Sequence, residues 1–134
     1  MDFRITIIRN RKPPEKNIQK DLDWFCKSFG FCEDSQAHTA SKVLKEIIRQ
    51  NAKGNAIGST ELAGRVDMSR GAVIHQLNRL VSAGLIEKSG RYYTLRGASI
   101  SDTIRELERD MQRIFEDFEE MAREIDEELG FMRR

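Results

Sequence analysis

One short stretch, SRGAVIHQLNRLVSAGLIEKSGRYYTLRG at residues 69–97, carries side chains suited to hydrogen bonding with a polar partner. Helical spacing over 69–83 places Val73, Leu77 and Leu80 on one side and leaves a polar side opposite. Guanidinium, imidazole and carboxamide groups on that side can bond the edges of nucleic-acid bases, and an aliphatic group among them can contact a thymine methyl. The outward positions are Arg70, Gly71, Ile74, His75 and Asn78, with Gln76 and Arg79 on the flanks.

Phosphate contacts are predicted around the same helix. Ser69 is a capping residue, and the N–H groups at a helix N-terminus attract anions. Gly71 lets the backbone approach a ligand closely. Lys88 and Arg91 lie at the tip of a predicted hairpin, with Arg96 just beyond it. Cations at these places suit the backbone or the minor groove of DNA.

The elements around this stretch are predicted from apolar spacing and from helix-stopping residues. Asp67-Met68 forms a turn, Gly84 ends the helix that follows it, and Ile57 lies in a short extended link. A short helix begins at Ser59 or Thr60, since either can cap it. Helices are expected over about 15–29, 37–51, 69–83 and from 100 onward. A strand is expected over 3–8, with Phe3, Ile5 and Ile7 on one face. Two further strands are expected over 85–88 and 91–95, joined at Ser89-Gly90.

The segment ELAGRVDMSRGAVIHQLNRLVSAGLIEKSGRYYTLR resembles the DNA-binding part of winged helix-turn-helix transcriptional regulators of the ArsR/MarR type. The resemblance covers about residues 37–97. It implies a mainly α fold with a small β-hairpin wing over 85–96, and double-stranded DNA as the partner. The motifs that carry it are Leu62-Ala63, the Ser69 cap, Val73, Leu77 and Leu80, Ala83-Gly84-Leu85-Ile86, and Tyr93-Thr94-Leu95.

The resemblance also bears on metals and effectors. ArsR members often sense metals through a cysteine motif near the turn, and this sequence has no cysteine between residues 33 and 134. We therefore expect no metal and no cofactor. MarR members often bind small phenolic compounds at a dimer interface, so the resemblance leaves an effector of that kind open.

The charge is divided along the chain. Residues 1–97 hold 17 Lys+Arg against 10 Asp+Glu, whereas residues 98–134 hold 6 against 12, and the net charge is +1. The basic part suits a polyanion, and the acidic part does not. We divide the chain into an N-terminal extension (1–36), a DNA-binding domain (37–97) and an acidic helix (98–134).

The acidic helix carries an apolar heptad, which is a dimerisation signal. A stripe of this length needs a partner helix, which is either its twin or the aromatic first helix of either subunit. Parallel, antiparallel and globular packing all stay open, and folding back on its own body as a monomer is the alternative. The predicted interface is Ile100, Ile104, Leu107, Met111, Ile114, Phe118, Met121 and Ile125.

The N-terminal stretch LDWFCKSFGFCED holds both cysteines and four of the ten aromatic residues. Such a cluster can line a ligand pocket, and the thiols can sense oxidation. Packing in the core or at a dimer interface is the commoner use of aromatics at helical spacing. Of the two thiols, Cys32 is expected to be the more exposed, beside Glu33 and Asp34.

Enzymatic and membrane functions are not indicated. The sequence has no P-loop, no G-x-S-x-G and no H-E-x-x-H motif, and no apolar run approaches a membrane span. We expect a cytoplasmic, dimeric, sequence-specific regulator that binds double-stranded DNA, with repression as the simpler mode. The alternative is a winged-helix adaptor in a transcription or replication assembly, in which the heptad helix recruits a different protein.

Overall fold

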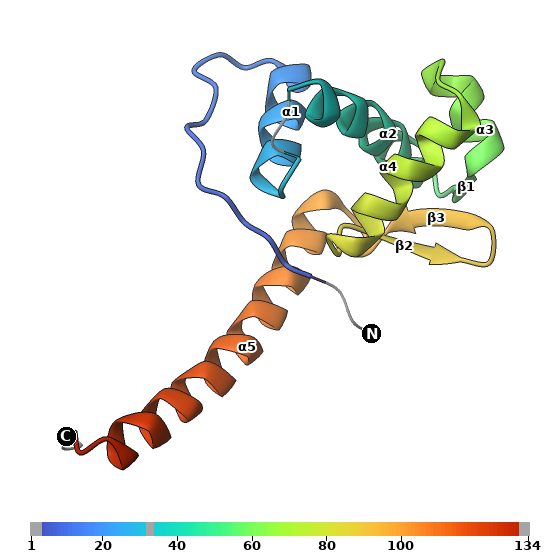
Figure 1. Cartoon of the computed structure of the whole chain (residues 1–134). Coiled ribbons are helices and arrows are strands. Elements are labelled where there is room, and N and C mark those ends of the chain that lie inside the picture. Colours follow the sequence, from blue (N-terminus) through green and yellow to red (C-terminus); the bar gives the residue numbers. More distant parts are fainter. Residues whose placement is uncertain (1–3, 32–33, 132–134) are drawn as a thin grey trace.

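The computed structural model describes residues 4–31 and 34–131 (Figure 1). In this part the chain is mostly helical, with an antiparallel sheet in the order β1-β3-β2, which confirms the predicted fold class. The elements are α1 (Ile18–Ser28), α2 (Asp34–Ala52), β1 (Ile57–Gly58), α3 (Ser59–Val66), α4 (Arg70–Ser82), β2 (Ile86–Ser89), β3 (Tyr92–Leu95) and α5 (Ile100–Glu128).

Helix α2 lies at the centre of the core and contacts α1, α3, α4 and β3. Its apolar stripe meets the inward sides of α3 and α4, so both helices of the helix-turn-helix are fixed against one support. Removing these apolar side chains from water is the main stabilising contribution. The largest fully buried side chains include Phe31, Leu44, Ile47, Ile57, Leu62, Leu77, Leu80, Leu85, Ile86 and Leu107.

The turn between α3 and α4 forms as predicted. Asp67 adopts a left-handed conformation with φ of 56°, which ends α3. Ser69 then caps α4, and its side chain accepts a hydrogen bond from the N–H of Ala72 at 3.1 Å. Gly84 ends the segment with φ of +79°. The predicted cap of α3 is wrong, because the capping position is Gly58, which offers no side-chain bond.

The wing differs from the prediction in two details. The turn lies at Gly90-Arg91, one residue later than expected, because Ser89 still pairs with Tyr92. Gly90 takes φ of +61° at the first central position of this two-residue turn. Tight hairpin turns need a positive φ at that position, and glycine adopts it readily. Ile57 is part of a strand, since it pairs with Tyr93 and adds β1 to the hairpin.

The predicted strand over 3–8 does not form in its described part, residues 4–8. The N–H of Arg4 donates to the carbonyl of Ser82 at 3.1 Å, and that of Ile8 donates to Ser28 at 2.7 Å. The segment therefore crosses the ends of α4 and α1 instead of pairing along a sheet. Ile5 packs on the core whereas Ile7 is exposed, and Phe3 lies outside the described residues.

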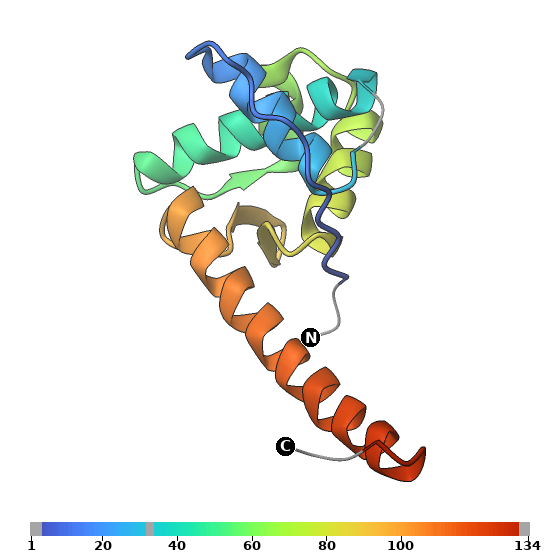
Figure 2. The same cartoon turned by 90° about the vertical axis from the view of Figure 1, so that its left-hand side faces the viewer.

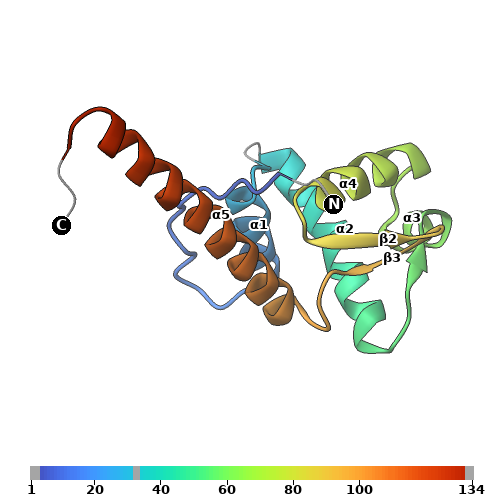
Figure 3. The same ribbon diagram turned by 90° about the horizontal axis from the view of Figure 1, so that it is seen from below.

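Helix α5 has two parts. Its first turns lie on the body, where Thr103 and Leu107 are buried. Leu107, predicted to contact a second subunit, is therefore already covered by its own chain. Residues 112–128, which we call the α5 overhang, are exposed throughout. Figures 1 and 2 show the overhang extending well beyond the body. Seen from below in Figure 3, it points away from the β2–β3 hairpin.

The junction between the wing and α5 is tightly packed. Arg96 forms an ion pair with Asp110, and the side chains of both are mostly buried. The N–H of Gly97 donates to the Thr103 hydroxyl oxygen at 2.9 Å. A Cβ atom at Gly97 would lie 2.7 Å from the Thr103 nitrogen and 2.8 Å from the Asp102 carbonyl carbon. The direction in which α5 leaves the body is therefore set by these contacts.

Replacing Gly97 with alanine should destabilise the protein by roughly 1–3 kcal/mol, because the added methyl overlaps the backbone of α5. Urea unfolding would measure the change. Gly64→Ala is the matched control, since no atom lies within 4 Å of a Cβ there. In the exposed interior of α3 that change should stabilise by roughly 0.5–1 kcal/mol. Equal effects of both substitutions would contradict the packing described for Gly97.

Candidate nucleic-acid interface

The outward side of α4 is polar and exposed. Gly71, His75, Asn78 and Ser82 are exposed along one line of this side, and Ile74 is half-buried beside them. The opposite side is fully packed, because Val73, Leu77 and Leu80 have no exposed surface. Gln76, predicted on the flank, is only 5% exposed and belongs to the buried side. A helix with a packed apolar back and a polar front is the form that fits a major groove.

A hollow of about 350 Å³ lies between the wing and the N-terminal ends of α3 and α4. Arg70 and Arg91 both line it, although they lie 21 residues apart in the sequence. The guanidinium carbon of Arg91 is 5.3 Å from the ring centroid of Tyr92, and its Nη2 donates to the Tyr92 hydroxyl at 3.2 Å. Glu61 also lines the hollow and pairs with Arg65 at 3.7 Å. The hollow thus joins two arginines with two helix N-termini, which suits an anion.

Lys88 is the other exposed cation of the wing. Its ammonium is 5.8 Å from the ring centroid of Tyr93, and the side chain is exposed. Tyr93 is buried in the sheet, so the wing cation rests on a fixed aromatic base. The sequence prediction placed Lys88 and Arg91 at the wing tip, and the structure places both there.

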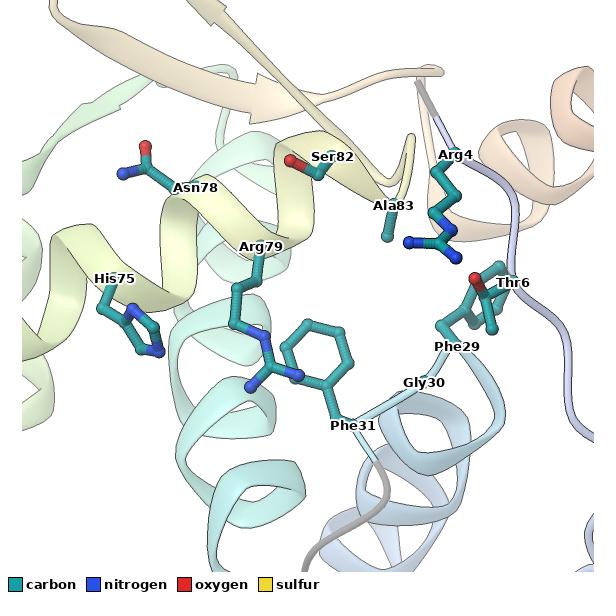
Figure 4. A pocket seen from close by; sticks show the side chains of 10 residues that line it. All are labelled: Arg4, Thr6, Phe29, Gly30, Phe31, His75, Asn78, Arg79, Ser82 and Ala83. Atoms are coloured by element: carbon teal, nitrogen blue, oxygen red, sulfur yellow. The ribbon is translucent and has the colours of Figure 1, made fainter. Parts of the chain in front are cut away.

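A second, larger hollow of about 640 Å³ borders the C-terminal half of α4 (Figure 4). His75, Asn78 and Arg79 line it from α4, and Arg4 lines it from the N-terminal segment. The charged side chains that line it are all basic, counting the histidine as basic when protonated. Sequence reasoning missed Arg4, because long-range contacts, among them the bond from its N–H to the carbonyl of Ser82, bring this distant segment beside α4.

Two predicted contact residues have partners inside the protein. The Arg79 guanidinium carbon lies 4.3 Å from the ring centroid of Phe31, and its Nη1 donates to the Gln36 side chain. Arg79 therefore ties α4 to α2 and to the segment that follows α1. Arg96 lies under α5 with 15% of its side chain exposed and is paired with Asp110. The structure gives Arg96 a role at the junction and not on the outer surface of the wing.

The aromatic N-terminal cluster is largely packing. The rings of Phe25 and Phe29 lie 5.0 Å apart, Phe31 is buried, and the Trp24 indole N–H donates to the carbonyl of Asn10 at 3.2 Å. Cys26 is completely buried in the same cluster. Burial, with a smaller contribution from Asp23, raises the pKa of its thiol to about 12. The packing interpretation is therefore supported for Cys26, and Cys32 lies outside the described residues.

Because only the thiolate is nucleophilic, Cys26 should resist alkylation in the folded protein. In a Cys32→Ser variant at pH 8, we expect iodoacetamide to react at least about a thousandfold more slowly with folded protein than with protein unfolded in urea. Mass spectrometry of timed samples measures both rates. Fast labelling of folded protein would contradict the burial of this thiol.

Within residues 4–31 and 34–131, no group of three or more His, Cys, Asp or Glu side chains is arranged to hold a metal ion. The expectation of no metal and no cofactor stays a prediction. In the same residues, no helix combines the length and the apolar character needed to cross a bilayer.

The geometry defines a winged helix-turn-helix domain, with a helix-turn-helix over α3 and α4 and a wing over β2 and β3. Residues 38–87 match the family described as winged helix-turn-helix DNA-binding. The match runs from α2 into β2 and supports DNA as the partner of this chain, without singling out the ArsR/MarR type. Neither the curated proteins nor the solved structures give a significant match.

Proposed function

We propose that the protein is a dimeric, sequence-specific transcription regulator of the ArsR/MarR type that binds double-stranded DNA and represses its target. The observation that carries the proposal is the alignment of two surfaces. The polar side of α4 and the arginine-lined hollow of the wing adjoin each other, because Arg70 belongs to both. One duplex can therefore contact a reading helix and a phosphate site together.

Base reading is assigned to the exposed centre of α4. Asn78 can bond adenine through its carboxamide, His75 can donate to a guanine acceptor, and Ile74 can contact a thymine methyl. Gly71 lacks a side chain at the end of this line, and nothing lies within 4 Å of a Cβ built there. The helix can thus approach the groove closely at its N-terminal end.

Phosphate binding is assigned to the N-terminal end of α4 and to the wing. The capped end of α4 at Ser69 directs N–H groups outward, and Arg70 and Arg91 stand beside it. Lys88 adds a further exposed cation on the wing. These phosphate contacts supply affinity for any DNA sequence, whereas the base contacts from the centre of α4 make the protein prefer particular sequences.

Dimerisation is assigned to the α5 overhang. Its large apolar side chains are exposed, between 44% for Ile114 and 65% for Phe118. An apolar stripe of this kind is stabilised by a partner helix. Because the acidic overhang points away from the wing, a second copy can join it without bringing acids to the DNA. A two-fold dimer presents two α4 helices to two half-sites.

Repression is the simplest mode for such a protein, since a bound dimer blocks access to a promoter without needing a second contact. A cytoplasmic location follows from the same function. We assign no catalytic step to the chain.

The test is selection of bound sequences from a random double-stranded DNA pool at two salt concentrations. An enriched two-fold site, with half-sites about one helical turn or more apart, is the expected result. Affinity should fall steeply with salt, since phosphate contacts release counterions. Binding without any enriched sequence would exclude sequence-specific regulation.

A second candidate is a winged-helix adaptor in a transcription or replication assembly. The same exposed overhang favours it, because an apolar helix face can recruit a different protein. Absence of DNA binding at low salt, together with a monomeric state, would favour this candidate.

A further inference from the structure

We propose that each α5 overhang docks antiparallel into an apolar groove beside α1 of the other copy, and that the basic segment 9–20 there holds its acidic side. This inference rests on the proposed dimer and specifies how the dimer is built. Four observations support it: an open groove, a wide stripe, a symmetric spacing and complementary charges.

The groove has a volume of about 470 Å³ and lies where α1, α2 and the start of α5 meet. Its apolar lining consists mainly of Pro13, Ile18, Leu22, Phe25, Ile48 and Ile100. Ile18 is 63% exposed, which is unusual for a large aliphatic residue on a helix of this body. Because Ile100 also begins the heptad of α5, the groove is continuous with the apolar stripe of its own chain.

The stripe on the overhang is wider than a two-helix seam needs. Heptad positions a and d are occupied by Ile114, Phe118, Met121 and Ile125, and the adjoining e positions add two more large apolar side chains. These are Phe115 and, directly after the overhang, Leu129, exposed by 57% and 75%. A seam formed by two α5 helices would bury positions a and d and leave this flank in water. A second surface beside the seam is therefore needed, and the groove supplies one.

The spacing of the heptad is the same in both directions from Ile100 to Ile125. An antiparallel partner can thus place Ile125 level with Ile100, and Met121 level with Ile104. Since Ile100 lines the groove, the tip of one overhang arrives at the groove of the other copy. Leu107 is buried against its own body and offers no surface to a partner, whereas Ile104 of the same stripe is 36% exposed.

The charges favour the antiparallel arrangement. The overhang, residues 112–128, carries eight acids and two arginines. A parallel pair would place two such acidic tips side by side, where like charges repel. The segment 9–20 carries five basic residues and one acid. Lys12 and Asp21 both line the groove, so the excess positive charge lies on the rim and not in the groove itself. Antiparallel docking therefore brings each acidic tip to a basic rim.

Cross-linking tests the arrangement directly in the full chain. Ile18→Cys and Leu129→Cys are introduced together in a Cys32→Ser background, and a short bismaleimide is added at low protein concentration. We expect a covalent dimer on a denaturing gel. Leu129→Cys alone should give none, because antiparallel tips would stand roughly 50 Å apart at 1.5 Å per residue. Ile7→Cys with Leu129→Cys is the matched control, since Ile7 is also more than half exposed but does not line the groove.

The outcomes separate this inference from the proposed function. Covalent dimers from Leu129→Cys alone would show parallel tips and overturn the docking. A dimer in sedimentation that never links Ile18 to Leu129 would also overturn it while leaving the dimeric regulator intact. A monomer at all concentrations tested would refute the proposed dimer itself.

Charge reversal gives a second test. Lys12→Glu/Lys16→Glu and Glu124→Lys/Glu128→Lys should each weaken the dimer by roughly tenfold or more at low salt, and their combination should restore most of the loss. Sedimentation equilibrium measures the dissociation constants. If the lysine variant lost DNA affinity with an unchanged dimer constant, segment 9–20 would be a DNA contact and the docking would be refuted.

Discussion

Replacing Phe118 and Met121 together with glutamate should convert the protein to a monomer and weaken binding to a two-fold DNA site by about 10²–10⁴-fold. Both side chains are more than half exposed on the α5 overhang and lie on its apolar stripe. In a dimer the second half-site is bound intramolecularly, and this advantage is lost when the subunits separate. Sedimentation velocity reports the subunit state, and titration of a labelled site reports the affinity.

The control for this prediction is Glu116→Gln/Arg123→Gln, which keeps the net charge and alters the side of α5 farthest from the stripe. It should remain a dimer and retain full affinity. Binding to a single half-site should be equal for all three proteins. If the Phe118/Met121 variant were a monomer yet bound the two-fold site normally, dimerisation would play no part in recognition.

Replacing Arg70 and Arg91 together with alanine should weaken binding to every DNA sequence by roughly 1.5–3 kcal/mol for each contact removed. Both arginines line the hollow between the wing and the helix N-termini, to which we assign the phosphate contacts. The slope of log affinity against log salt should decrease by about two. Titrations of specific and random duplexes at several salt concentrations measure both quantities.

Asn78→Ala is the informative comparison, because Asn78 lies on the exposed reading side of α4. It should cost about 1–3 kcal/mol at one base pair, relax the preference there and leave the salt slope unchanged. If both variants changed the salt slope alike, the division between phosphate and base contacts would be wrong.

Local signals in the sequence predicted the DNA-binding helix well. Ser69 caps α4 because its hydroxyl reaches the N–H of Ala72, a contact made within three residues. Gly84 ends the same segment through its positive φ, which costs glycine little. The heptad correctly placed the start of α5 at Ile100. Each of these features depends on neighbours along the chain and is therefore visible in the sequence.

Features that depend on distant contacts were not predictable in the same way. Segment 4–8 has the composition of a strand, but the edge it would need is absent at its place in the fold, and its backbone bonds go to Ser82 and Ser28. Arg96 looks like a wing cation until α5 brings Asp110 beside it. The hollow that joins Arg70 to Arg91 likewise appears only when the wing folds back toward α4.

The packed junction of Arg96 and Gly97 limits how far α5 can swing relative to the wing. In a dimer joined through α5, the separation of the two α4 helices is then fixed when the protein folds, before it binds DNA. DNA turns by about 34° for each base pair, at 10–10.5 base pairs per turn. One base pair inserted between the half-sites would rotate one half-site by about 34° relative to the α4 helix that reads it. Five inserted base pairs would carry that half-site to the opposite face of the duplex. A regulator of this construction selects its targets by helical phase as well as by base sequence.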